Sequence, residues 1–215
     1  MTPTGLLLDL DGTMVDSEPL QRAGYAAFFE DRSWESPDLS LFTGRRAEDV
    51  FATETGPWSA HDPAVLAAQV RDLVPRDLPP DAVPGARECV LAAAAAGIPV
   101  AIVTSARPDW VALAVGGGLG LLDEIDLVVT AEDVTDGKPD PAGFLLACSR
   151  LGIAPGGAVA VEDSVAGVRA AAAAGVGRVV GVTTSVTAAT LTAAGAHATY
   201  ADLRPLAADL AQMAR

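Results

Sequence analysis

Short apolar segments alternate with helix-like segments over most of this chain, and this alternation limits the folds open to it. The apolar segments are bounded by Gly, Pro, Thr or Asp, as buried strands often are. The segments between them have helical length and close with Gly97, Gly152 and Gly175, and glycine often follows the last residue of a helix. Because helices usually connect parallel strands, the pattern predicts an α/β fold, a parallel sheet with helices on both faces. Strands are expected at 6–10, 98–103, 127–129, 158–161, 179–182 and 198–200.

The alternation breaks off after the first predicted strand and resumes about seventy residues later. Residues 17–84 contain no convincing strand, and their apolar residues recur at helical spacing. Ser17 is placed to cap a helix whose first turn contains Pro19. We therefore predict a Rossmann-like core formed by 1–16 and 85–215, with 17–84 inserted as a helical cap. Hinges are expected near 16–17 and 79–84.

The composition excludes several classes of partner. The chain has 215 residues, half of them apolar, and a formal net charge of −14, which makes nucleic acid and anionic membranes improbable partners. Its N-terminal apolar run is interrupted at Asp9 and has no basic region, unlike a signal peptide. Cys89 and Cys148 are isolated and fit two reduced thiols. We expect a cytoplasmic protein that binds no nucleic acid and no membrane and is a monomer or a weak dimer.

Polar residues follow three of the predicted strands at the point where each strand ends. They are Asp9 and Asp11, then Thr104 and Ser105, then Glu162 and Asp163. The carboxyl ends of parallel strands meet at one edge of a sheet, where open α/β folds bind ligands. Four acids gathered there repel one another unless a cation lies among them, and Mg²⁺ prefers such oxygen ligands. The sequence therefore predicts a magnesium site at this edge.

Lys138 is the single lysine of the chain, beside thirteen arginines. It lies in a loop between Gly137 and Pro139, just after a predicted strand. A lone compact ammonium suits a point contact with a carboxylate and a phosphate oxygen, whereas arginine presents a planar fork. An exposed turn lysine is the plainer interpretation, and its position at the acidic edge favours a functional one.

Four short motifs resemble those of the haloacid dehalogenase superfamily of phosphohydrolases, in the same order. They are DLDGT (9–13), TS (104–105), GKPDP (137–141) and VEDS (161–164). The helical insertion after the first motif resembles the C1-type cap of the subgroup that contains β-phosphoglucomutase and many sugar-phosphate phosphatases. The resemblance covers essentially the whole chain.

The resemblance implies a role for each motif residue. Asp9 is expected to be the nucleophile that forms an aspartyl phosphate, and Asp11 the acid and base that protonates the leaving alcohol and activates water. Thr104 and Lys138 are expected to bind the transferred phosphoryl group, with Ser105 as a further donor.

The same resemblance implies how Mg²⁺ is bound. Asp9, the backbone carbonyl of Asp11 and Asp163 are expected to hold it, with Glu162 close to the metal or coordinating it.

Other residues are candidates for substrate binding. Arg107 follows the second motif, and Gly44, Arg45 and Arg46 resemble a cap loop that reads the substrate in this subgroup. Two solvated arginines are an equally good interpretation of that loop. Gln21 occupies the position where the mutase carries a histidine.

The function expected from these residues is that of an Mg²⁺-dependent phosphatase acting on a small phosphorylated sugar or polyol. A β-phosphoglucomutase-like mutase is the main alternative, although Gln21 cannot titrate and the predicted cap contains no lysine. A non-catalytic protein that binds a phosphorylated metabolite is a third possibility. A dehalogenase is disfavoured because Asp11 is present.

Overall fold

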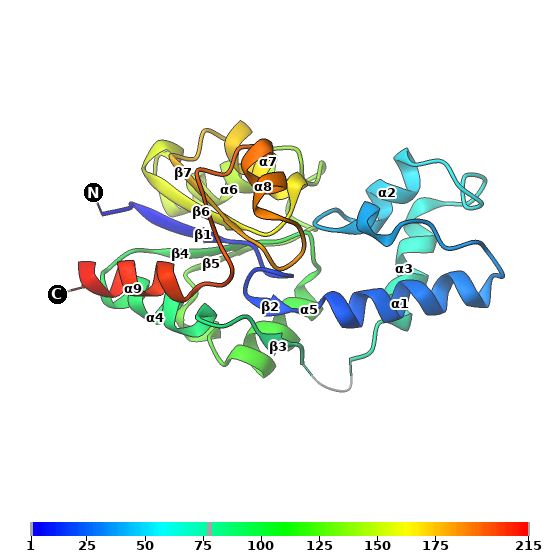
Figure 1. The fold of residues 1–215 in the computed structure, drawn as a ribbon, viewed down its shortest axis with the longest axis horizontal. Coiled ribbons are helices and arrows are strands. Elements are labelled where there is room, and N and C mark those ends of the chain that lie inside the picture. Colours follow the sequence, from blue (N-terminus) through cyan, green and yellow to red (C-terminus); the bar gives the residue numbers. More distant parts are fainter. Residues whose placement is uncertain (1, 77–78, 215) are drawn as a thin grey trace.

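The computed structural model describes residues 2–76 and 79–214. Six parallel strands form one sheet in the order β5-β4-β1-β6-β7-β8 (Figure 1). The strands are β1 (Gly5–Leu8), β4 (Val100–Val103), β5 (Leu127–Val129), β6 (Ala158–Glu162), β7 (Arg178–Val182) and β8 (Ala198–Tyr200). The predicted α/β fold with a Rossmann-like parallel sheet is confirmed.

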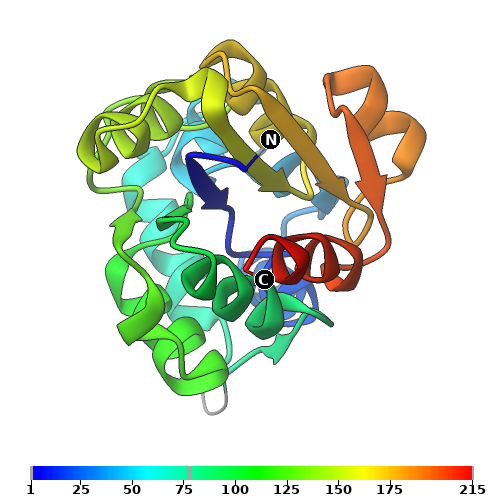
Figure 2. The same ribbon diagram turned by 90° about the vertical axis from the view of Figure 1, so that its left-hand side faces the viewer.

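Helices cover both faces of the sheet (Figures 1 and 2). One face carries α4 (Ala86–Ala95), α5 (Pro108–Val111), the π-helix η2 (Ala112–Leu119), η3 (Leu122–Glu124) and α9 (Arg204–Met213). The other carries α6 (Ala142–Leu151), η4 (Pro155–Gly157), α7 (Val165–Ala173) and α8 (Ala188–Ala194). Leu6 and Leu8 of β1 pack against the helices on the first of these faces, and Leu7 packs against those on the second, because successive side chains of a strand point to opposite faces. The run of leucines is thus a strand buried on both sides.

A group of helices stands apart from the sheet and packs around an aromatic cluster of its own. These are α1 (Glu18–Asp31), the 3₁₀ helix η1 (Leu39–Phe42), α2 (Ala47–Thr53) and α3 (Pro63–Leu73). Phe28 and Phe51 lie at the centre of the cluster with ring centroids 5.6 Å apart, and Trp58 contacts Phe51 edge to face. We call these helices the cap. The boundaries that the sequence suggested for it, 17–84, stay a prediction.

A short ribbon joins the two chain crossings between sheet and cap. β2 (Val15–Asp16) pairs antiparallel with β3 (Asp81–Ala82). The expectation that 17–84 contain no strand is therefore wrong at β3, because two residues are too few to show an alternating pattern. The ribbon lies at the predicted hinges.

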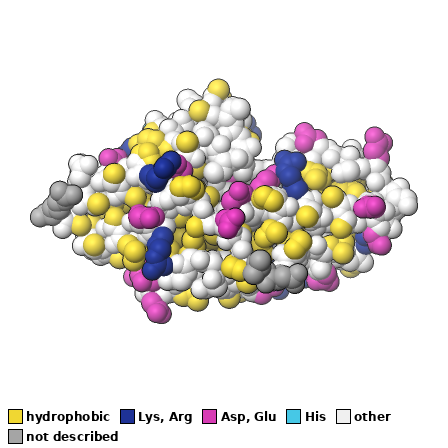
Figure 3. All heavy atoms as spheres, turned by 60° about the horizontal axis from the view of Figure 1, so that its bottom comes forward, with side chains coloured by type: hydrophobic (Ala, Val, Ile, Leu, Met, Phe, Trp, Pro, Cys, Tyr) yellow, Lys and Arg dark blue, Asp and Glu magenta, His cyan; other side chains and the backbone are white. Residues whose placement is uncertain are grey.

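The surface agrees with the acidic composition. Acidic side chains are spread over the face in Figure 3, with apolar side chains between them. Within 2–76 and 79–214 no helix is long and apolar enough to cross a membrane.

Candidate active site

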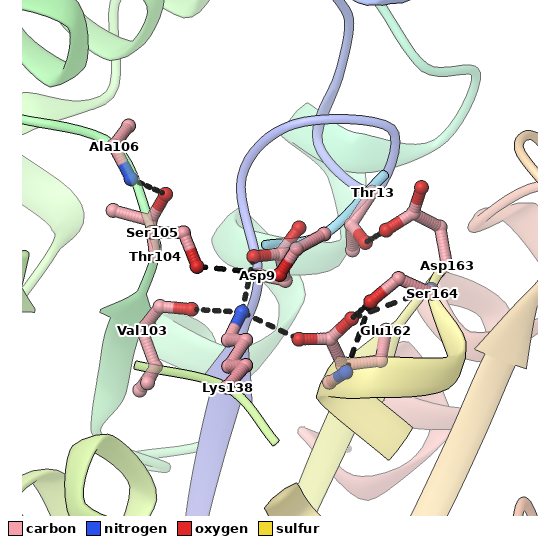
Figure 4. Close-up of polar contacts among 12 residues, drawn as sticks. Asp9, Thr13, Val103, Thr104, Ser105, Ala106, Lys138, Glu162, Asp163 and Ser164 are labelled. Atoms are coloured by element: carbon pink, nitrogen blue, oxygen red, sulfur yellow. Dashed lines mark hydrogen bonds and ion pairs between the residues drawn. The ribbon is translucent and has the colours of Figure 1, made fainter. Parts of the chain in front are cut away.

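The ends of β1, β4 and β6 bring the predicted polar residues together, as the topology required (Figure 4). Asp9, Glu162 and Asp163 are buried, and each offers a carboxylate oxygen within 4.8 Å of the others. We call these three residues the acid trio. Lys138 reaches the trio from the loop after β5 and is also buried.

Lys138 is surrounded by three oxygen atoms. Its Nζ lies 2.5 Å from Asp9 Oδ1, 2.9 Å from the carbonyl oxygen of Val103 and 2.5 Å from Glu162 Oε1. Burial alone would lower the pKa of Lys138, but the carboxylates of Asp9 and Glu162 outweigh it and hold that pKa above its usual value. The side chain is therefore a fixed cation that links Asp9, directly after β1, to Glu162 at the end of β6.

Glu162 is held on both of its oxygens. Oε2 accepts hydrogen bonds from the backbone N–H of Ser164 at 3.4 Å and from its hydroxyl at 3.1 Å. Oε1 lies at ion-pair distance from Lys138 but outside hydrogen-bonding alignment. Burial first, and then the charge of Asp9, raise the pKa of Glu162 to about 7.

Asp163 is anchored by two hydroxyl groups. Thr13 Oγ1 donates to Oδ1 at 3.4 Å, and Ser185 Oγ donates to Oδ2. Burial, followed by the charges of Asp9 and Glu162, raises the pKa of Asp163 well above its usual range. Ser185 was not among the predicted residues, although it follows the end of β7 and the rule that found Thr104 applies equally to it.

Asp11 lies beside the trio in different surroundings. Its Oδ1 accepts hydrogen bonds from Ser17 Oγ at 2.5 Å and from the indole N–H of Trp110 at 2.8 Å. Burial, and to a smaller extent the charge of Asp9, raise the pKa of Asp11 to about 6. Ser17 is the N-cap residue of α1, as expected, but its side chain makes no capping hydrogen bond and donates to Asp11 instead.

A cavity of about 230 Å³ separates this edge of the sheet from the cap. Asp9, Asp11, Asp163 and Thr104 line it from the sheet side. From the cap side it is lined by apolar and aromatic residues, among them Tyr25, Phe42 and Val70, together with polar and charged ones, among them Gln21 and Arg71. A mostly apolar cavity with a few convergent polar groups is the usual form of a small-molecule site.

The predicted substrate-binding residues all border this cavity, but their side chains differ in what they contact. They are Gln21, Gly44, Arg45, Arg46, Ser105 and Arg107. Arg45 pairs with Glu54 at 2.9 Å within the cap, and Arg107 pairs with Glu132. Arg46 pairs with Asp49 at 2.8 Å and donates to backbone carbonyls across the cavity edge. Ser105 Oγ donates to the carbonyl of Gly44 at 3.3 Å.

The acid trio fits a divalent cation. Three carboxylates and the single ammonium of Lys138 leave a formal charge of −2 in a buried site. Burial, followed by the repulsion among the neighbouring carboxylates, raises the pKa values of Glu162 and Asp163, and a bound cation would oppose both effects. Clustered carboxylate oxygens are hard ligands of the kind that Mg²⁺ takes.

The sequence model of the haloacid dehalogenase-like hydrolases matches residues 3–175, most of the chain. This span contains Asp9, Asp11, Thr104, Lys138 and Asp163. The resemblance that the four motifs suggested is confirmed.

Two relatives that are about one third identical to this chain are named as phosphatases. The chain is 36% identical to the validoxylamine A 7'-phosphate phosphatase of Streptomyces hygroscopicus subsp. limoneus, over 83% of this chain and 85% of the relative. It is also 36% identical to hexitol phosphatase A of Escherichia coli, over 80% and 79% of the two chains. A crystal structure of a hydrolase from Pseudomonas syringae has the same fold, with a TM-score of 0.83 at 23% identity and coverage of 99% and 100%.

Proposed function

Since this chain belongs to the haloacid dehalogenase-like hydrolases, we propose that it is an Mg²⁺-dependent phosphatase of a small phosphorylated sugar or polyol. The observation that carries the proposal is the acid trio with Lys138 at its centre, facing a cavity beside an aspartate whose pKa is raised toward neutrality. The phosphatases of a hexitol phosphate and of validoxylamine A 7'-phosphate among its relatives support a polyhydroxylated substrate.

Asp9 is the proposed nucleophile. Lys138 holds its Oδ1, and the backbone N–H of Asp9 donates to the carbonyl of Val161 at 3.0 Å. Both contacts fix the carboxylate at the end of β1 and leave Oδ2 to attack phosphorus. The attack breaks the bond from phosphorus to the substrate oxygen and forms an aspartyl phosphate.

Asp11 is the proposed acid and base. Ser17 and Trp110 hold its Oδ1, so Oδ2 is the oxygen that carries and transfers the proton. With a pKa near 6, the group is partly protonated in mildly acidic solution and accepts a proton readily from water at neutrality. It gives a proton to the leaving alcohol and later takes one from the water that hydrolyses the aspartyl phosphate.

Asp9, Asp163 and the backbone carbonyl of Asp11 are the proposed ligands of Mg²⁺, with Glu162 close by. When bound, the ion offsets the charge of the trio and draws negative charge from the phosphoryl oxygens. Glu162 then serves chiefly to hold Lys138, because both of its oxygens already have partners.

Thr104, Ser105 and Lys138 are the proposed phosphoryl-binding residues. Two of the three N–H groups of Lys138 donate to Asp9 and to the carbonyl of Val103, and Glu162 Oε1 is at ion-pair distance only. Lys138 therefore acts through its charge and its hold on Asp9, and its third N–H is not committed to a protein hydrogen bond among the described residues.

The test is a screen of hexose, hexitol and cyclitol phosphates for phosphate release, with Mg²⁺ and with EDTA. We expect release that EDTA abolishes; full activity in metal-free buffer would contradict the metal assignment. A second assay adds glucose 1,6-bisphosphate and follows the conversion of β-glucose 1-phosphate to glucose 6-phosphate. The mutase alternative predicts that this isomerisation is faster than the release of free phosphate, and the phosphatase predicts the reverse. No turnover of any phosphate ester would favour a binding protein.

A further inference from the structure

Arg46 spans the edge of the cavity and reaches the sheet side. Its Nη1 lies 3.3 Å from the carbonyl oxygens of Ala131 and Val134, and Nη2 lies 2.6 Å from that of Thr135. Its Nε donates to Asp49 in the cap at 2.8 Å. The side chain is only 15% exposed, so its charge is offset by these four oxygens more than by solvent.

The segment that receives Arg46, residues 131–135, is built independently of the arginine. We call it the carbonyl turn. Asp133 Oδ2 accepts hydrogen bonds from the N–H and the hydroxyl of Thr130, both at 2.9 Å, and Asp133 also pairs with Arg150. The N–H of Ala131 donates to the carbonyl of Ala106 at 2.9 Å. Three carbonyls are thus presented by a turn that its own contacts hold in place.

The loop that carries Arg46 also touches residues of three motifs. Ser105 donates to the carbonyl of Gly44, and a Cβ at Gly44 would collide with the side chain of Ser164. A Cβ at Gly137 would come within 2.6 Å of Arg46 Nε, so the guanidinium lies directly on the backbone before Lys138. Only glycine permits this approach.

We propose that Arg46 is a positioning residue that fastens the cap to the carbonyl turn and thereby sets the place of Lys138. Three directed carbonyl contacts fit the planar fork of a guanidinium and cannot all be made by a lysine side chain. Arg45, its neighbour, contacts only Glu54 and Thr53 on the cap among the described residues, so it offers a matched control. The catalytic half of this proposal rests on the proposed function, and the positional half does not.

The test uses the fact that Lys138 is the single lysine of the chain. Growth with ¹³C-labelled lysine gives one ε-methylene NMR signal, which reports the surroundings of Lys138 without any substrate. We expect this signal to move or broaden in Arg46→Ala and Arg46→Gln, neither of which adds a second lysine, and to keep its position in Arg45→Ala. An unchanged signal in both Arg46 variants, or an equal change in Arg45→Ala, would overturn the proposal. Arg46→Gln keeps a long polar side chain and the single labelled lysine, and it serves if Arg46→Ala does not fold.

The kinetic arm uses p-nitrophenyl phosphate with Mg²⁺. We expect both Arg46 variants to lower kcat by about tenfold or more with KM changed by less than about threefold, because a positioning residue acts on the reacting groups and not on substrate contact. Arg32→Ala removes a cap arginine that does not line the cavity and that donates to the carbonyl of Phe28 and to Gln69, and it is expected to stay within about twofold of the unmodified chain. A rise in KM at constant kcat would instead assign Arg46 to substrate binding and overturn the positioning role. If the unmodified chain hydrolyses nothing, the proposed function fails and the NMR signal alone decides the positional half.

Discussion

The sheet edge and the cap wall of the same cavity are built in different ways. At the edge, the buried ammonium of Lys138 lies 2.5 Å from the carboxylates of Asp9 and Glu162, and strand ends fix the positions of these acids. The cap wall mixes apolar side chains with arginines, of which Arg45 and Arg46 are paired with acidic residues of the cap. The edge has the features of a reaction centre and the cap wall those of a surface that selects a substrate. Substitutions at the edge should therefore change kcat, and substitutions on the cap wall, apart from those of the positioning residue Arg46, should change KM.

The largest effect is expected from Asp9→Asn. An amide cannot attack phosphorus as a carboxylate does, so kcat should fall by at least about 10³-fold, and no phosphoenzyme should be found by mass spectrometry. Asp123→Asn, at an exposed site on η3, is a control that should keep full activity. Near-normal turnover of a sugar phosphate by Asp9→Asn would place the nucleophile elsewhere.

Asp11→Asn should lower turnover and raise the free energy of unfolding. An unfolded aspartate ionises near 3.8 and folded Asp11 near 6, so between these values the unfolded chain binds fewer protons and the free energy of unfolding falls as the pH rises. Removing the group should raise the free energy of unfolding above pH 6, by at most about 3 kcal/mol, and by less because the side chain stays partly open to the cavity.

The measurement is urea unfolding of both proteins at pH 4 and pH 8, with turnover assayed in parallel. The difference in stability should be larger at pH 8. An Asp11→Asn protein that is less stable than its parent at pH 8 would show that the Ser17 and Trp110 hydrogen bonds outweigh the burial of the charge.

Lys138→Arg should lower kcat/KM by at least about tenfold, equal to about 1.4 kcal/mol of transition-state stabilisation. A guanidinium is too large to replace an ammonium held by three oxygens in a buried site. Arg107→Lys, at a half-exposed pair, is the matched exchange in the other direction and should cost less. Wild-type kinetics for Lys138→Arg would show that the sheet edge is no more sensitive to an exchange of cations than the half-exposed pair of Arg107.

The smallest effect is expected on the cap wall. Gln21→Ala should raise KM for a sugar phosphate by about two- to tenfold and leave kcat within about twofold, because it removes a contact made equally before and during reaction. The measurement compares kcat and KM separately for several sugar phosphates. A fall in kcat as large as that of Lys138→Arg would mean that the cap takes part in the chemistry.

The residues that meet at the sheet edge could be predicted from the sequence alone, because the topology of a parallel sheet determines where the strand ends meet. Asp9, Thr104, Glu162 and Asp163 needed only the assumption of a parallel sheet. Ser185 could have been found by the same rule.

The contacts of the arginines at the rim of the cap could not be predicted from the sequence, because the partner of a long side chain depends on which groups the fold places near it. Arg45 and Arg46 are adjacent in the chain, yet one contacts the cap and the other the carbonyl turn. The π-helix η2 was also missed, since its glycines 116–118 are typical of a loop.

The ribbon of β2 and β3 has a consequence for how such a protein changes over time. Val15 lies opposite Ala82 and Asp16 opposite Asp81, so the chain leaves the sheet and returns to it at neighbouring points. Facing residues of an antiparallel pair have Cα atoms about 5 Å apart, a gap that a turn of a few residues can close. The intervening helices can therefore be exchanged as a cassette without moving any strand end. The exchanged cassette would bring a new cap wall to the acid trio, and it would have to supply again the hydrogen bond that Ser17 makes to Asp11 and the contact that Arg46 makes to the carbonyl turn.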